Sequence, residues 1–247
     1  MAGISDTSPE AARVLADVLR KMPFDRKWRQ MGEIYQLAKT LRAAGAAGDK
    51  EMTVNGPNEN LQVLEEVIAA LSRLGIPYAL GGSWASCLFG QMRLTLDADL
   101  SVEPFPGKEA ALCACFGESY YISLDCVKDA VRGRSSFNII HLDSGFKVDC
   151  FVRKDRPFEQ SLMARRRSHI LPGQQGPPLQ CVTPEDVVLL KLEWFRLGNE
   201  ASERQWRDVL GVLQVQAGRL DDGYLDHWAA DLSVADLLRR ARQESVI

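Results

Sequence analysis

Two aspartates separated by one residue, Asp97 and Asp99, constrain the fold of this chain more than any other feature. Successive side chains of a β-strand point to opposite faces, so the two carboxylates share one face and the flanking apolar residues share the other. The apolar face must pack on a core, whereas neighbouring carboxylates repel each other and resist desolvation. Segment 95–103 is therefore predicted to be a strand that packs on one face and carries acids on the other.

A third carboxylate, Asp149, lies on a predicted β-hairpin. Segments 136–142 and 146–152 have strand-like composition and flank the turn sequence Asp143-Ser144-Gly145. If the second of these strands lies beside the 95–103 strand, the three carboxylates converge.

Such a cluster needs a compensating charge. A divalent cation is the plainest solution, and oxygen-only ligands suit magnesium. Three carboxylates can hold two metal ions about 3.5–4 Å apart, which is the arrangement used for in-line phosphoryl displacement. We therefore predict that Asp97, Asp99 and Asp149 are catalytic residues and ligands of two Mg²⁺ ions. The competing interpretation is a solvated edge of the sheet.

The sequence Gly81-Gly82-Ser83 follows a short predicted strand at 77–80. Two glycines allow the backbone to approach a phosphate group closely. A short helix is predicted to follow, with Ser83 as its N-cap, and the start of a helix offers free N–H groups and a positive dipole end. We predict that Gly81, Gly82 and Ser83 bind nucleotide phosphates.

Two basic residues are also predicted to bind the nucleotide. Arg93 shares the face of the acids by the same alternation, and either contacts a phosphate or pairs structurally with Asp97. Lys191 lies at the edge of an apolar stripe on a predicted helix that begins after Thr183. Binding of a triphosphate and snorkelling of the side chain both explain its position.

The order of predicted elements indicates a mixed sheet covered by helices, in the α/β (α+β) class. An amphipathic helix over 61–74 precedes the first strand, and a helix near 108–116 and a strand at 120–124 precede the hairpin. N-cap and first-turn signals beyond residue 181 predict a helical C-terminal region.

Helical spacing between residues 8 and 41 predicts an N-terminal helical hairpin, and the glycines between 45 and 60 mark a linker. The predicted domains are therefore residues 1–55, a core at 56–180 and a helical region at 181–247. The apolar stripe of the hairpin must be covered by the core, by a second copy or by another protein. Self-association or a protein partner through residues 1–55 is thus an expectation.

Composition excludes several classes of protein. A formal net charge of -3 over 247 residues is unlike that of a strongly basic nucleic-acid binder. The six cysteines form no Cys-x-x-Cys pair and there are three histidines, so zinc-ligand spacing is absent. No apolar run reaches the roughly 18 residues of a membrane helix, and the start of the chain lacks a secretory pattern. We expect a cytoplasmic protein with reduced thiols, bound to no membrane.

The order of these motifs resembles that of a known superfamily. Gly81-Gly82-Ser83, then Arg93-x-Thr95-x-Asp97-x-Asp99, then Val148-Asp149 is similar to the DNA polymerase β-type nucleotidyltransferases over roughly residues 61–155. Within that superfamily the chain looks most like bacterial AbiEii-type and related small nucleotidyltransferases. Those proteins often carry a helical C-terminal part with a lysine and a later basic-acidic pair, and Lys191 and Arg207-Asp208 occupy comparable places.

The resemblance implies a nucleotidyltransferase-like fold and a Mg²⁺-dependent enzyme. Such an enzyme moves NMP from an NTP to an acceptor hydroxyl and releases pyrophosphate. The acceptor stays open among tRNA, a protein and a small molecule. The alternative is a non-catalytic interaction protein built on the same fold, such as one partner of a toxin–antitoxin pair.

Overall fold

The computed structural model describes residues 57–91, 93, 95, 97–170, 174 and 176–245. Within these residues the chain forms two compact units. The sheet unit runs from residue 57 to 84 and from 93 to 182, and the helical unit contains residues 85–91 and 183–245. The predicted N-terminal hairpin lies outside the described residues, so the predicted domain boundaries stay predictions.

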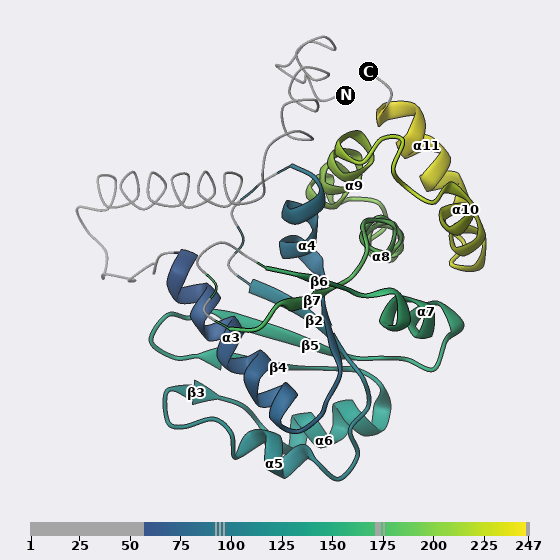
Figure 1. The fold of residues 1–247 in the computed structure, drawn as a ribbon. Helices are drawn as coiled ribbons and strands as arrows, with labels where there is room; N and C mark the ends of the chain where they lie inside the picture. The colour runs from purple at the N-terminus through teal and green to yellow at the C-terminus, as the bar shows by residue number, and fades with distance from the viewer. Residues whose placement is uncertain are drawn as a thin grey trace. The chain divides into compact units, whose positions relative to one another are not determined.

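The sheet unit contains the predicted mixed sheet (Figure 1). Within the described residues the sheet has seven strands in the order β3-β4-β5-β2-β1-β7-β6. Strands β2 and β5 pair in parallel, as do β1 and β7, and the other neighbours are antiparallel. The strands are β1 (Tyr78–Leu80), β2 (Asp97–Val102), β3 (Tyr120–Tyr121), β4 (Ser136–His141), β5 (Lys147–Val152), β6 (Arg167–His169) and β7 (Leu179–Cys181).

One face of the central strands forms the core. Alternate residues of β2 and β5 are buried, and those between them are more exposed except for Asp149, as the alternation predicts for a sheet packed on one face. The buried positions are Ala98, Leu100, Val102, Val148, Cys150 and Val152. Helix α3 (Pro57–Arg73) lies across one face of the sheet (Figure 1). Its predicted apolar stripe is buried, as expected of an amphipathic helix.

Several elements differ from the sequence prediction. The strand predicted at 120–124 ends at Tyr121, because Ser123 accepts a hydrogen bond from the Cys126 N–H and begins α6 (Leu124–Gly133). Helix α5 covers Glu109–Cys113 only. Helix α7 (Pro157–Arg165) and strands β6 and β7 were not predicted.

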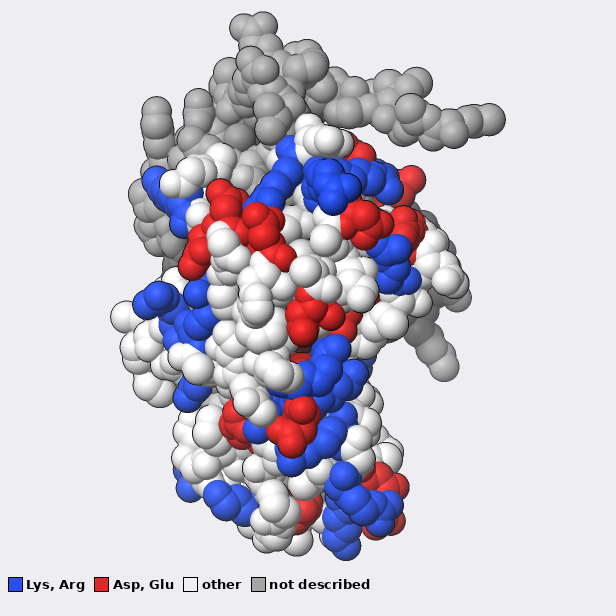
Figure 2. Space-filling model, turned by 90° about the vertical axis from the view of Figure 1, so that its right-hand side faces the viewer, with Lys and Arg blue, Asp and Glu red and all other residues white. Residues whose placement is uncertain are grey.

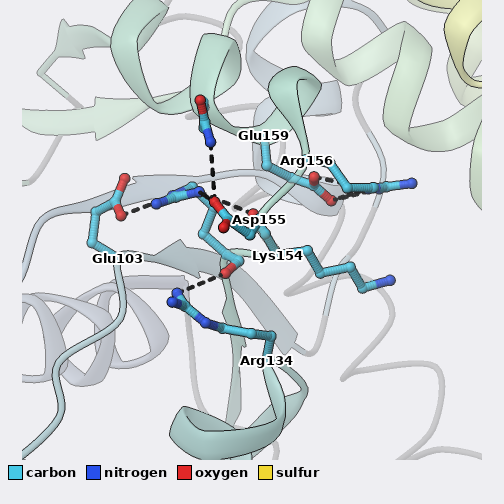
Figure 3. Close-up of polar contacts among 8 residues, drawn as sticks. Glu103, Arg134, Lys154, Asp155, Arg156 and Glu159 are labelled. Atoms are coloured by element: carbon cyan, nitrogen blue, oxygen red, sulfur yellow. Dashed lines mark hydrogen bonds and ion pairs between the residues drawn. The ribbon is translucent and has the colours of Figure 1, made fainter.

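The ends of the parallel pair β2–β5 are tied by polar contacts (Figure 3). The Arg153 N–H donates to the Val102 carbonyl oxygen at 2.9 Å, and its guanidinium pairs with Glu103 at 2.8 Å. Arg134, at the end of α6, donates to the Arg153 carbonyl oxygen at 3.2 Å. These contacts follow the last residues of the two strands and help to hold their register.

The helical unit confirms the prediction of a helical C-terminal region. It contains α8 (Pro184–Leu197), α9 (Glu203–Val215), α10 (Asp222–Asp231) and α11 (Ala235–Ser245). Thr183 and Asp186 form a reciprocal capping box at the start of α8. Helix α4 (Gly82–Phe89) begins in the sheet unit and ends in the helical unit.

Lys and Arg side chains are interspersed with Asp and Glu over the face seen in Figure 2. This mixture of charges agrees with the small net charge of the chain. Among the described residues, no helix has both the length and the apolar character needed to cross a membrane.

Replacing Leu64 by alanine tests the packing of α3. Leu64 is fully buried, whereas the neighbouring Gln62 is exposed. We expect Leu64→Ala to lower the free energy of unfolding by about 2–5 kcal/mol, because it removes buried methyl groups and leaves a cavity. Gln62→Ala, measured in the same urea titration followed by circular dichroism, is expected to change it by about 0.5 kcal/mol or less. Equal losses would contradict the assigned face of the helix.

Candidate functional site

The parallel pairing of β2 with β5 brings the three predicted acids to one face of the sheet. Asp97 lies beside Lys147, and Asp99 lies beside Asp149 two residues further along the strands. Asp97 and Asp99 are partly exposed, and Asp149 is buried. The structure therefore joins two motifs that are about fifty residues apart in the sequence.

Each oxygen of the Asp149 carboxylate has a partner. Oδ1 accepts a hydrogen bond from the Asn138 side-chain amide, and Oδ2 lies 2.6 Å from the Lys147 ammonium nitrogen. Asn138 faces Asp149 across the antiparallel pair β4–β5. The hydrogen bond to Asp149 raises the pKa of Lys147, burial opposes this rise, and the nearby carboxylates of Asp97 and Asp99 add to it.

Asp97 is held from the opposite side of the site. The Thr95 hydroxyl donates to Asp97 Oδ1 at 3.0 Å, and the Trp84 indole N–H donates to the Asp97 carbonyl oxygen at 2.8 Å. Trp84 lies in the first turn of α4, so this bond ties the start of that helix to the first acid. The ring of Trp84 also makes an edge contact with Phe146, directly before β5.

The glycine turn packs against the second acid. The Gly81 N–H donates to the Asp99 carbonyl oxygen at 2.8 Å. Gly82 has φ +53°, and a Cβ at this position would lie 1.7 Å from Asp99 Oδ2. The turn and the acids, predicted separately as phosphate and metal sites, are thus adjacent, and the contact requires a residue without a side chain.

Ser83 and Arg93 contact each other. An Arg93 guanidinium N–H donates to the Ser83 hydroxyl oxygen. Ser83 was predicted as the N-cap, but α4 already begins at Gly82, so Ser83 lies within its first turn. The contact places Arg93 beside the glycine turn, and its role in binding phosphate stays a prediction.

Lys191 belongs to the helical unit. Its ammonium nitrogen lies 2.8 Å from Asp208 and 3.0 Å from the Gln205 side-chain oxygen, and both charged groups are buried. The neighbouring Arg207 instead pairs with Glu203 on the exposed surface of α9. The predicted contact of Lys191 with a triphosphate stays a prediction.

Lys147 and Asn138 were missed by the sequence analysis. Alternation alone could have found Lys147, because it lies two residues before Asp149 and so shares its face. Asn138 required the register of the hairpin, which its turn sequence does not fix.

The donor atoms of Asp97 and Asp99 are carboxylate oxygens, which suit magnesium. Among the described residues, however, no group of three or more His, Cys, Asp or Glu side chains is arranged to hold a metal ion. Asp149 is instead paired with Lys147 and Asn138. Two bound ions stay a prediction.

No protein-family model matches the chain, and a search of curated proteins found no similar sequence. Solved structures with partly similar folds were found. ANT(2'')-Ia in complex with adenylyl-2''-tobramycin has 16% sequence identity and a TM-score of 0.47, over 71% of this chain and 97% of that one. The antibiotic-resistance factor ANT(2'')-Ia in solution has 15% identity and a TM-score of 0.41, over 75% and 95%.

An antigenic nucleotidyltransferase-like protein from Paracoccidioides brasiliensis has 18% identity and a TM-score of 0.45, over 75% of this chain and 93% of that one. All of these likenesses are distant in sequence and in shape. The assignment of a mixed α/β fold accordingly rests on the topology of the sheet itself.

Substitutions at Gly82 and Gly81 test the close approach of the turn to Asp99. Gly82→Ala is expected to lower the melting temperature and to displace the Asp99 carboxylate, because of its positive φ and the overlap of the new Cβ with Oδ2. Gly81→Ala is the matched control, since its Cβ would meet its nearest atoms at 3.9 Å. Thermal melting of the two variants should separate them clearly, and equal melting temperatures would refute the tight contact.

A second pair of variants tests the buried ion pair of the helical unit. Asp208→Ala leaves the Lys191 ammonium buried without its carboxylate, which typically lowers the free energy of unfolding by about 3–5 kcal/mol. Arg207→Ala removes only an exposed pair with Glu203 and should have little effect. Both are measured by chemical denaturation, and a stable Asp208→Ala protein would show that Lys191 has an alternative partner or access to water.

Proposed function

We propose that the chain is a metal-dependent nucleotidyltransferase that moves NMP from an NTP to an acceptor hydroxyl. The observation that carries this proposal is the register of β2 and β5, which sets Asp97, Asp99 and Asp149 on one face next to the Gly81-Gly82-Ser83 turn. An acid cluster beside a tight glycine turn offers both halves of a nucleotide site. The superfamily resemblance of the same motifs agrees with this assignment.

Asp97 and Asp99 would hold the divalent ion, because their oxygens share a partly exposed face. Once bound, the ion supplies Lewis-acid stabilisation of charge on the phosphate oxygens. Thr95 and Trp84 orient Asp97, and Gly82 gives Asp99 the space that it occupies. Backbone groups of the turn and the start of α4 would bind the phosphate oxygens.

The transfer itself needs no covalent enzyme intermediate. The acceptor hydroxyl oxygen forms a bond to the α-phosphorus of the NTP, while the bond from that phosphorus to the pyrophosphate oxygen breaks. The hydroxyl proton passes to the Asp149 carboxylate, and pyrophosphate carries away the negative charge. The chain contributes alignment and electrostatic stabilisation.

Two finer assignments belong to the same proposal. Arg93, held beside the turn by Ser83, would contact the triphosphate, and Lys191 is a second proposed contact. The AbiEii-type resemblance rests on Lys191 and the Arg207-Asp208 pair, and the ion pair between Lys191 and Asp208 is compatible with it. The acceptor stays open among tRNA, a protein and a small molecule.

A non-catalytic interaction protein is the second candidate. The Lys147–Asp149 ion pair favours it specifically, because it compensates one carboxylate of the site without any ligand. The two candidates differ in nucleotide binding, which the interaction protein does not need.

Titration of the full chain with each Mg·NTP by calorimetry tests the proposal. We expect binding of at least one NTP, weakened at least about tenfold in Asp97→Asn and Asp99→Asn, because each variant removes a negative charge within a few ångströms of the ion. Asp129→Asn, an exposed acid paired with Arg132, is the control and should bind like the unmodified protein.

Incubation of the same proteins with α-labelled NTPs and cellular RNA, protein or metabolites then identifies the acceptor. Transfer of label by the unmodified chain and not by the two acid variants supports the enzyme. Absence of nucleotide binding for all four NTPs would favour the interaction protein instead.

A further inference from the structure

Lys147 is the one cation among four residues that form a square on neighbouring strands. Asp97 and Lys147 make one row of the β2–β5 register, and Asp99 and Asp149 make the next row on the same face of the sheet. Residues two apart in a strand share a face, so all four side chains leave the same side of the sheet. The square joins three carboxylates to one ammonium group.

The ammonium group is placed where a metal ion on Asp149 would bind. It lies 2.6 Å from Asp149 Oδ2, whereas Mg²⁺ requires about 2.0–2.1 Å to a carboxylate oxygen, so the two cations compete for that oxygen. The other oxygen, Oδ1, already accepts a hydrogen bond from Asn138. Each oxygen of Asp149 therefore already has one partner that the chain itself supplies.

The contact is also sheltered from solvent. The side chain of Asp149 is 13% exposed and that of Lys147 is 41% exposed, so the pair is screened less than an exposed ion pair. Asp97 and Asp99 act on the same ammonium group through space. The positive charge of Lys147 thus offsets the negative charge of Asp97 and Asp99 as well as that of its direct partner, Asp149.

The ammonium group lowers the charge that bound ions must compensate. Three carboxylates and one ammonium group leave two net negative charges, whereas three carboxylates alone would leave three. The donor geometry points the same way, because Asp149 is the acid whose carboxylate oxygen lies at ion-pair distance from Lys147.

We propose that Lys147 takes the place of the acceptor-side metal ion, so that the site of this chain binds one divalent ion instead of two. The inference rests on the proposed function and narrows its predicted pair of ions to one. Lys147 acts through Asp149 as a positioning residue: it fixes the carboxylate that faces the acceptor and excludes an ion from it.

Counting bound ions on the full chain tests this proposal without measuring activity. Mn²⁺ is titrated into the protein with saturating non-hydrolysable NTP, and free Mn²⁺ is followed by electron paramagnetic resonance. The unmodified chain is expected to hold one ion in total for each bound NTP, namely the ion that the nucleotide shares with Asp97 and Asp99. Lys147→Met, which keeps the length of the side chain and removes its charge, should bind a second ion or bind the first at least about tenfold more tightly.

Two further variants make the result specific. Lys147→Arg keeps the positive charge and should keep the count of one, and Lys154→Met, at an exposed lysine beyond the end of β5, should leave both count and affinity unchanged. Thermal melting identifies any variant that fails to fold. If Lys147→Met does not fold, the number of bound ions is decided by the counts measured on the unmodified chain and on Lys147→Arg.

The outcomes separate this inference from the proposed function. Two ions for each bound NTP on the unmodified chain, or an unchanged count and affinity in folded Lys147→Met, would overturn the role of Lys147 and leave a nucleotidyltransferase intact. Failure of every folded form of the chain to bind the Mn²⁺–NTP complex would overturn the proposed function, and the inference with it.

Discussion

The parallel pairing of β2 with β5 is the interaction on which the candidate site depends. All six residues of β2 have a partner in β5, and the register alternates core rows with the rows Asp97–Lys147, Asp99–Asp149 and Ser101–Phe151. A slip of one residue would turn Val148 away from the core and place the Lys147 ammonium and the Asp149 carboxylate among apolar side chains. The cost of burying these charges therefore selects the same register that the chemistry needs. The apolar rows and the Arg153–Glu103 contact stabilise it further.

A second constraint acts at the glycine turn. Asp99 occupies the space in which any side chain at residue 82 would have to lie, and the backbone there has a positive φ. The absence of a side chain at Gly82 thus serves both the local conformation and the approach of an acid to the turn. The phosphate-binding half and the metal-binding half of the proposed site are in contact through this one residue.

Much of the sheet unit could be predicted from the sequence, because its strands alternate clearly. The alternation around Asp97 and Asp99 and the hairpin that carries Asp149 are confirmed, as is the helix that begins after Thr183. Strands β6 and β7 could not be predicted, because three residues are too few to show a period. The start of helix α6 could have been predicted from the sequence, because its N-cap residue is Ser123.

The site shows a similar division. Which residues share a face followed from local spacing, so Lys147 was within reach of the sequence. Local spacing did not predict which strands are neighbours in the sheet. The paired strands β2 and β5 are separated in the sequence by two helices and two other strands. The partner of Asp149 on β4 depends on the hairpin register and was accordingly missed.

The same topology has a consequence for the order in which the molecule assembles. The hairpin β4–β5 closes over a short turn, whereas the parallel pair β2–β5 requires a crossover of more than forty residues, and closing a longer loop costs more entropy. We therefore expect Asp149 to meet Asn138 early in folding and Asp99 late. Until then we expect the edge of β2 that later pairs with β5 to stay open, while its other edge can already pair with the nearby β1. The two carboxylates of β2 would discourage association of this open edge with other chains, and so protect against aggregation before the candidate site forms.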